Sequence, residues 1–151
     1  MLVSLEYQLI YLIKLNRWLY LKFPIIGFFL SDLCRHFIRI YCSCDISPKA
    51  IIGDKVKFPH PIGIVIGEGV LIGDRVKIWH HVTIGSHGKE GVDKAYPVIG
   101  NDVKIYVNSS VLGGVKVGNE VIVGAHSLVM KNVPNRKIVA GVPAVEIGEL
   151  C

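Results

Sequence analysis

Between Ile46 and Val129, large apolar side chains recur at intervals of six residues, apart from two longer gaps. Twelve of these thirteen positions hold Ile or Val: Ile46, Ile52, Phe58, Ile66, Ile72, Ile78, Ile84, Ile99, Ile105, Val111, Val117, Val123 and Val129. A period of six fits neither an α-helix nor a long alternating strand, and a β-sandwich has no reason to keep it. It predicts very short strands joined by tight turns and stacked as a solenoid, with these side chains filling the core. Glycine follows seven of the positions, and we expect it to ease the turns.

Residues 1–44 follow a different pattern, because their apolar side chains are spaced roughly as on a helix. Pro24 and Gly27 predict a division into two helices. The longest uncharged stretch, residues 23–31, is too short to span a membrane, which takes about 20 apolar residues. No signal-peptide pattern is present either. We expect this helical segment to pack on the repeat or on a sister subunit, or else to lie on an anionic membrane as a basic amphipathic surface.

The composition narrows the class of protein. Half of the residues (51%) are hydrophobic and 19% are charged, which excludes a disordered chain and favours subunit interfaces or membrane contact. The net charge is +5, but the basic residues form no run, so we expect no nucleic-acid partner. A small ligand that carries phosphate stays a candidate. The four cysteines show neither metal-ligand spacing nor a disulfide framework. We therefore expect a reduced, cytoplasmic setting and no metal.

The six-residue period is broken at two places, and a regular solenoid needs no such breaks for its stability. The spacing from Phe58 to Ile66 is eight, and the extra pair of residues falls beside His60. The spacing from Ile84 to Ile99 is fifteen, so nine residues are inserted within 86–97. This stretch is polar and contains glycine. We expect this second insertion to be a loop that covers a substrate.

Stacking follows from the register if three hexapeptides make one coil. Phe58 then lies under Ile78, Ile105 and Val123, so the residues two positions further on form a column of His60, His80, Val107 and Ala125. The next column holds Pro61, His81, Asn108 and His126. The register therefore predicts that His60 and His80 are neighbours at one corner of the solenoid.

Three motifs carry a resemblance to a known family. They are His60 with Gly63-Ile-Val-Ile-Gly67-Glu68, then Val82-Thr-Ile-Gly85 with Gly88-Lys89, and finally Gly141-Val-Pro-Ala144. Over residues 45–148 the chain resembles the hexapeptide-repeat acyltransferases of the serine acetyltransferase group. Within that group it looks most like the relatives that acetylate bacterial polysaccharides, including the colanic acid type. The resemblance implies an all-β domain at 45–151, a left-handed parallel β-helix with three hexapeptides per coil, preceded by a short α-helical segment at 1–44. It also implies a homotrimer with its sites between subunits.

The resemblance assigns His60 as the general base, a role that suits a side chain with an ordinary pKa near 6.5. Serine acetyltransferases carry an Asp before this histidine, where this chain has Pro59, and an Arg-His-Pro run that grips serine, where it has Ala95-Tyr96-Pro97. We therefore expect a backbone carbonyl, Glu68 or His80 to orient His60. We expect Tyr96 to contact the acceptor. These departures favour a sugar hydroxyl over serine.

The same resemblance implies acetyl-CoA as the donor. Matching positions lie along the coil edges or in the insertion: Gly85, Ser86, Lys89, Val107 and Ala125. Three further basic residues are candidates for the CoA phosphates or, equally, a solvated basic tail: Lys131, Arg136 and Lys137. We expect His81, His87 and His126 to be turn residues that support the site.

The leading hypothesis is an acetyl-CoA-dependent O-acetyltransferase acting on a sugar or glycan precursor, at the inner face of the membrane if the helical segment binds lipid. The first alternative is serine O-acetylation for cysteine biosynthesis. The second is a non-catalytic or metal-binding β-helix, which His80, His81 and His126 keep open. No cysteine lies in the matched motifs, which argues against an acyl-cysteine route.

Overall fold

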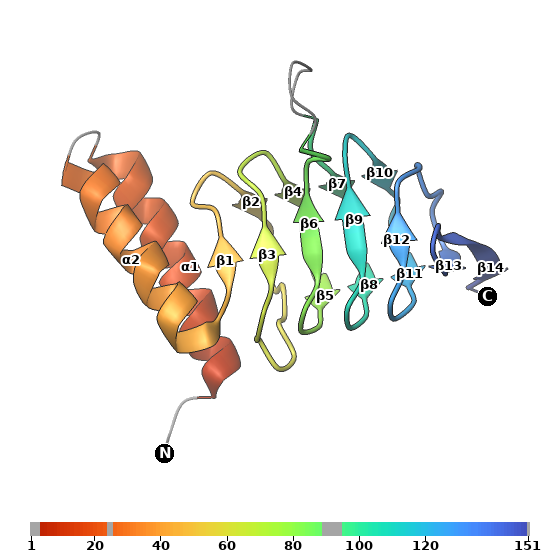
Figure 1. Cartoon of the computed structure of the whole chain (residues 1–151), viewed down its shortest axis with the longest axis horizontal. Helices are drawn as coiled ribbons and strands as arrows, with labels where there is room; N and C mark the ends of the chain where they lie inside the picture. The colour runs from red at the N-terminus through yellow and green to blue at the C-terminus, as the bar shows by residue number, and fades with distance from the viewer. Residues whose placement is uncertain (1–3, 24–25, 89–94, 151) are drawn as a thin grey trace.

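The computed structural model describes residues 4–23, 26–88 and 95–150, which form a helical hairpin followed by a three-sided β-helix (Figure 1). The hairpin consists of α1 (Leu5–Lys22) and α2 (Ile26–Cys42). The first sheet contains β1 (Asp45–Ile46), β3 (Val65–Ile66), β6 (Thr83–Gly85), β9 (Ser110–Leu112) and β12 (Leu128–Val129). The second contains β2 (Ile51–Ile52), β4 (Leu71–Ile72), β7 (Val98–Ile99) and β10 (Lys116–Val117). The third contains β5 (Lys77–Ile78), β8 (Lys104–Ile105), β11 (Ile122–Val123), β13 (Lys137–Ala140) and β14 (Val145–Glu149).

The predicted stacking of one coil on the next is confirmed. Pairing between coils is parallel, and Ile78 pairs with Ile105, which in turn pairs with Val123. A bridge between Lys57 and Lys77 brings the Phe58 coil into the same register. Only the last pair, β13 with β14, is antiparallel among the described strands.

The core of the β-helix lies along its axis and is built from the six-residue positions. Phe58 is 1% exposed, and Ile78, Ile84 and Ile105 are fully buried. Burying each such side chain stabilises the fold by about 1.5–3 kcal/mol. The turns form three edges, which we name by what they carry. The histidine edge joins the third sheet to the first, the insertion edge joins the first to the second, and the ladder edge joins the second to the third.

Glycines after the core positions have a different role from the one we expected. The positive φ angles of the ladder edge fall three positions after the core residue: Lys55, Arg75, Asp102, Glu120 and Arg136. A Cβ atom on Gly73 would lie 2.8 Å from the carbonyl oxygen of Gly100, and one on Gly100 would lie 2.8 Å from that of Gly118. These glycines therefore allow close stacking of coils rather than the turn conformation.

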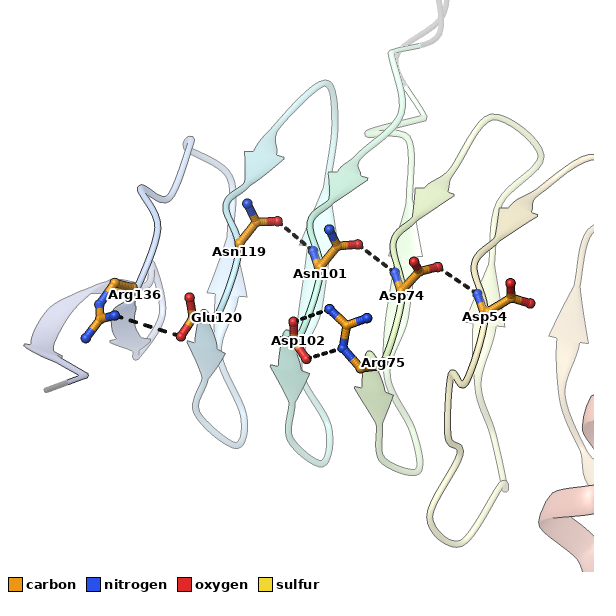
Figure 2. A network of polar contacts seen from close by, with 8 residues as sticks. All are labelled: Asp54, Asp74, Arg75, Asn101, Asp102, Asn119, Glu120 and Arg136. Carbon is orange, nitrogen blue, oxygen red and sulfur yellow. Dashed lines mark hydrogen bonds and ion pairs between the residues drawn. The ribbon is translucent and has the colours of Figure 1, made fainter.

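A ladder of polar side chains satisfies the backbone at this edge (Figure 2). The backbone N–H of Asp54 donates to Asp74 Oδ1, that of Asp74 to Asn101 Oδ1, and that of Asn101 to Asn119 Oδ1, each at 2.8 Å. Beside it, the Arg75 guanidinium donates two hydrogen bonds to Asp102, at 2.7 and 2.6 Å. The side chains of the ladder edge therefore have a structural role, because they accept hydrogen bonds from the backbone of the neighbouring coil.

The helical hairpin packs at the β1 end of the β-helix (Figure 1), as the packing hypothesis for residues 1–44 expected. Arg17 Nη1 donates to the carbonyl oxygen of Ala50 at 2.8 Å. Asp45 accepts from Arg35 Nε at 2.7 Å and from Arg39 Nη2 at 2.6 Å, which joins α2 to β1. Between the helices, the buried Ser31 hydroxyl donates to Asn16 Oδ1 at 2.6 Å. Within the described residues, neither helix is long and apolar enough to cross a membrane.

The contacts at Asp45 predict that acid weakens the packing of the helical hairpin on the β-helix. Burial alone would raise the pKa of the Asp45 carboxyl, but hydrogen bonds from Arg39 and Arg35 outweigh it and lower the pKa. A lowered carboxyl pKa gives stability that is present at neutral pH and is lost as the pH falls through the folded-state pKa. Asp45→Asn should therefore lower the free energy of unfolding by about 1 kcal/mol at neutral pH, and the difference should vanish in acid.

Urea unfolding followed by circular dichroism at neutral and acidic pH measures this effect. Asp102→Asn is the control, because its ion pair with Arg75 is more exposed to solvent, which screens the charges and leaves the pair with little effect on stability. A loss of stability in Asp45→Asn that is the same at both pH values would contradict the prediction.

Candidate active site

His60 and His80 lie together on the histidine edge, as the register predicted. Their ring centroids are 6.3 Å apart and the rings meet edge to face, at 76°. His60 is exposed and has a left-handed backbone, with a φ of 53°. The two extra residues before Ile66 widen this turn, in which the Ile62 N–H donates to the His60 carbonyl and the His81 N–H donates to the Ile62 carbonyl, both at 2.8 Å. The break in the repeat thus presents His60 to solvent beside His80.

The imidazole of His80 has an orphaned nitrogen. Its Nδ1 is the one buried side-chain nitrogen or oxygen of the described residues that lacks a hydrogen-bond partner. Burying such an atom without a partner costs free energy, so stability gives no reason for a histidine here. Hydrogen bonding among the described residues therefore does not account for a histidine at this position.

Three other residues of this edge are explained by their backbone. His81, Asn108 and His126 have φ angles of 55°, 59° and 57°, and His and Asn are among the side chains found most often in that conformation. The His81 ring lies over Gly63, whose own φ is 67°. Among the described residues, no three His, Cys, Asp or Glu side chains gather to hold a metal ion. These side chains therefore have the geometry of turn residues, as we expected for His81 and His126.

Glu68 does not orient His60 of its own chain, contrary to one of our expectations. It follows Ile66 by two positions and so lies on the insertion edge, at the opposite end of the first sheet from the histidine turns. There its carboxylate accepts from Lys49 Nζ at 3.0 Å and from the Tyr96 hydroxyl at 3.1 Å. Sequence reasoning missed Lys49, although counting the register from Ile46 would have placed it beside Glu68.

Tyr96 is held firmly on the insertion edge. A Cβ atom on Gly67 would lie 3.1 Å from its Cε1, so the ring packs directly on this glycine backbone. Burial and the hydrogen bond to Glu68 raise the pKa of the Tyr96 phenol, while Ser86 and Lys49 oppose this rise. Ser86 and Glu68 therefore both act on the same phenol, which makes this a second polar cluster, separate from the histidines.

The residues expected to bind acetyl-CoA do not gather on one edge of a single chain. Val107 and Ala125 lie on the histidine edge, in the column above His80. Gly85, Ser86 and Lys131 belong to the insertion edge, and Lys89 lies outside the described residues.

Two of the basic candidates already have partners within the chain. Lys137 pairs with Glu146 at 2.7 Å and Glu149 at 2.9 Å, and these carboxylates raise its pKa. Arg136 donates to the Leu150 carbonyl at 3.0 Å. These contacts at the far end of the β-helix fit the solvated basic tail better than a phosphate site.

Comparison with known proteins identifies the relatives of this chain. The family described as "Bacterial transferase hexapeptide (six repeats)" matches residues 96–131. The serine acetyltransferase of Mycobacterium tuberculosis is 41% identical over 120 residues, which cover 80% of this chain and 52% of that protein. Serine acetyltransferase 4 of Arabidopsis thaliana is 46% identical over 104 residues, covering 69% and 29%.

Solved structures give the same result. The serine acetyltransferase of Neisseria gonorrhoeae superposes with a TM-score of 0.86 at 34% identity, over 94% of this chain and 55% of that one. The Vibrio cholerae serine acetyltransferase gives a TM-score of 0.88 at 34% identity, over 97% and 55%. This chain spans about half the length of the Mycobacterium tuberculosis protein and of these two structures.

These relatives correct one expectation and support another. They are serine acetyltransferases, so the expected closeness to polysaccharide-modifying acetyltransferases is not supported. The hexapeptide repeat and these structural neighbours imply that the coils wind in the left-handed sense. By sequence and by fold, this chain is similar to serine acetyltransferases over most of its own length, and it carries the hexapeptide repeat of bacterial transferases.

Proposed function

We propose that this chain is a subunit of an acetyl-CoA-dependent O-acetyltransferase, with the hydroxyl group of L-serine as the acceptor. The observation that carries the proposal is its similarity to serine acetyltransferases over the whole repeat, combined with an exposed histidine pair at a break in that repeat. The relatives favour serine over the sugar hydroxyl of our leading hypothesis.

In this proposal His60 is the general base. Its imidazole takes the proton of the acceptor hydroxyl while the hydroxyl oxygen attacks the thioester carbonyl of acetyl-CoA. A tetrahedral intermediate forms, and its oxyanion needs a hydrogen-bond donor such as a backbone N–H. When the intermediate collapses, the carbon–sulfur bond breaks and the departing thiolate takes the proton from His60. The products are the acetyl ester and CoA, and no covalent enzyme intermediate is needed.

His80 is proposed as a positioning residue for this base. Pro59 precedes His60, so no carboxylate stands next to the base in sequence. The His80 ring meets the His60 ring edge to face, in the range of separations at which aromatic rings contact each other. In this proposal the contact limits the rotation of the His60 ring and so positions the base.

A complete site is proposed to need a second copy of the chain. The histidine edge and the insertion edge lie at opposite ends of the first-sheet strands, at the bottom and the top of Figure 1. A three-fold assembly of parallel β-helices places the histidine edge of one subunit beside the insertion edge of the next. Acetyl-CoA would then lie between Val107 and Ala125 on one side and Gly85 and Ser86 on the other, in a homotrimer.

Tyr96 and Glu68 are proposed to face the acceptor from the neighbouring subunit. Tyr96 lies in the run where the resemblance has a serine-gripping Arg-His pair, and its phenol donates a hydrogen bond to the Glu68 carboxylate. A carboxylate can accept a hydrogen bond from the ammonium group of serine, but it also suits the hydroxyls of a sugar. The sugar acceptor therefore remains the competing outcome of the assays below.

The first prediction concerns the base. His60→Ala should lower kcat/KM for acetyl transfer by about 10²- to 10⁴-fold, because the acceptor proton loses its base. The measurement is CoA thiol release with L-serine, and with a panel of sugars and nucleotide sugars, using the full chain. His81→Asn is the matched control, since Asn tolerates the same left-handed backbone and should leave activity nearly unchanged.

Either of two results would count against this proposal. Full activity in His60→Ala would exclude its role as the base, and turnover with a sugar but not with serine would replace the proposed acceptor.

The second prediction concerns acceptor recognition. Tyr96→Phe removes the hydroxyl that donates to Glu68 and leaves the ring on Gly67 in place. We expect KM for the acceptor to rise by about tenfold, with KM for acetyl-CoA unchanged, because one hydrogen bond that orders the Glu68 carboxylate is lost. Initial-rate kinetics with each substrate varied in turn measure both constants. An unchanged acceptor KM would place Tyr96 outside the acceptor site.

A further inference from the structure

We infer that the exposed apolar face of α2 is a membrane-docking surface, on which the helical hairpin lies flat against an anionic lipid bilayer. This inference goes beyond the proposed acetyl transfer and does not depend on it.

The surface is a continuous stripe along the whole of α2. Its members recur three or four residues apart and are 52–72% exposed: Ile26, Phe29, Leu33, Phe37 and Ile40. Phe28, Leu30 and Tyr41 widen it, at 41–59% exposed. Together they expose on the order of 900 Å² of mostly apolar surface. The largest apolar patch on a typical soluble monomer covers roughly 300–600 Å².

The other face of α2 makes the contacts with the rest of the molecule. Gly27, Ser31, Ile38 and Cys42 are the buried residues of this helix, and Ser31 bonds to Asn16 of α1. An ordinary surface helix buries its large apolar side chains and exposes its polar ones. In α2 most of the large apolar side chains point outward and mainly small residues point inward, so an apolar medium is the natural partner for the stripe.

Aromatic and basic side chains at the C-terminal end of α1 favour lipid as that medium. Trp18 and Phe23, at the hairpin end of α1, are 48% and 41% exposed and pack edge to face with centroids 5.6 Å apart. Lys22 Nζ lies 5.4 Å from the centroid of the Trp18 ring. Exposed Trp beside Lys is typical of the boundary between headgroups and acyl chains, where the ring is half buried and the cation reaches the headgroups.

The charge balance favours an anionic surface in particular. Residues 4–42 contain five Lys and Arg against two Asp and Glu. Asp45 lies between Arg35 and Arg39 and neutralises one of these two charges, so the hairpin stays positive. Anionic headgroups attract such a segment at roughly 1 kcal/mol per basic residue near the surface. The 17 residues of α2 extend for about 25 Å, which suits a helix lying in the plane of the interface.

Flotation of the full chain with lipid vesicles tests the proposal. We expect binding to vesicles of phosphatidylcholine mixed with phosphatidylglycerol, weaker binding in high salt, and little binding to phosphatidylcholine alone. The double substitution Phe29→Ser and Phe37→Ser should weaken binding by about tenfold or more, because two exposed aromatic rings are removed from the interface.

The matched control substitutes Val142→Ser and Ile147→Ser, which are 71% and 64% exposed at the opposite end of the β-helix. This variant should bind vesicles like the wild type. Circular dichroism and CoA release should be unchanged in the Phe29/Phe37 variant, which shows that its fold is intact. Vesicle binding without any acetyl transfer would leave the docking surface standing and remove only the proposed function.

Two results would overturn the inference. One is a wild-type chain that does not float with anionic vesicles, or that floats equally well after the double substitution. The other is a wild-type chain that stays in solution as a large assembly, which the double substitution splits in sedimentation velocity. That outcome would assign the stripe to a second copy of this chain.

Discussion

The register between coils is the constraint on which the rest of this structure depends. Each strand bonds to the same side of the coil before and after it, and the core residues stack in three columns. A shift of one residue would turn the core side chains outward, so both irregular segments are confined to turns. Ile66 still pairs with Ile46 and Ile84 across the first break, and Ile99 still pairs with Ile72 and Val117 across the second. The irregular turns therefore place polar side chains at the edges of the β-helix without disturbing its core.

This constraint also separates the two halves of the proposed site. His60 and His80 occupy the turns before the first sheet, whereas Tyr96 and Glu68 occupy the turns after it. No turn conformation can bring these clusters together within one chain, because a rigid strand lies between them. The proposed trimer resolves this separation. The α1–α2 hairpin packs at the β1 end of the β-helix, where Arg17 donates to carbonyl oxygens in the first turn of the insertion edge.

Much of this arrangement could be predicted from the sequence, since the six-residue period sets the columns and therefore the meeting of His60 and His80. Other features could not be predicted because they depend on neighbouring coils. The role of Gly73 depends on the Gly100 carbonyl above it, and the lowered pKa of Asp45 depends on two arginines of α2. Glu68 was misplaced for a different reason, because a linear motif linked it to His60 while the register assigns it to another edge. The helical spacing of residues 26–42 likewise predicted a helix, but not which of its faces is exposed.

The central claim is that a working site takes His60 from one subunit and Tyr96 from the next, and mixed trimers test it most directly. His60→Ala and Tyr96→Ala chains, each inactive alone, are unfolded and refolded together in equal amounts, and acetyl transfer is measured. Random mixing gives one intact site in every mixed trimer, so the account predicts recovery of about a quarter of wild-type activity. A mixture no more active than either variant alone, or a Tyr96→Ala chain with full activity by itself, would contradict the account.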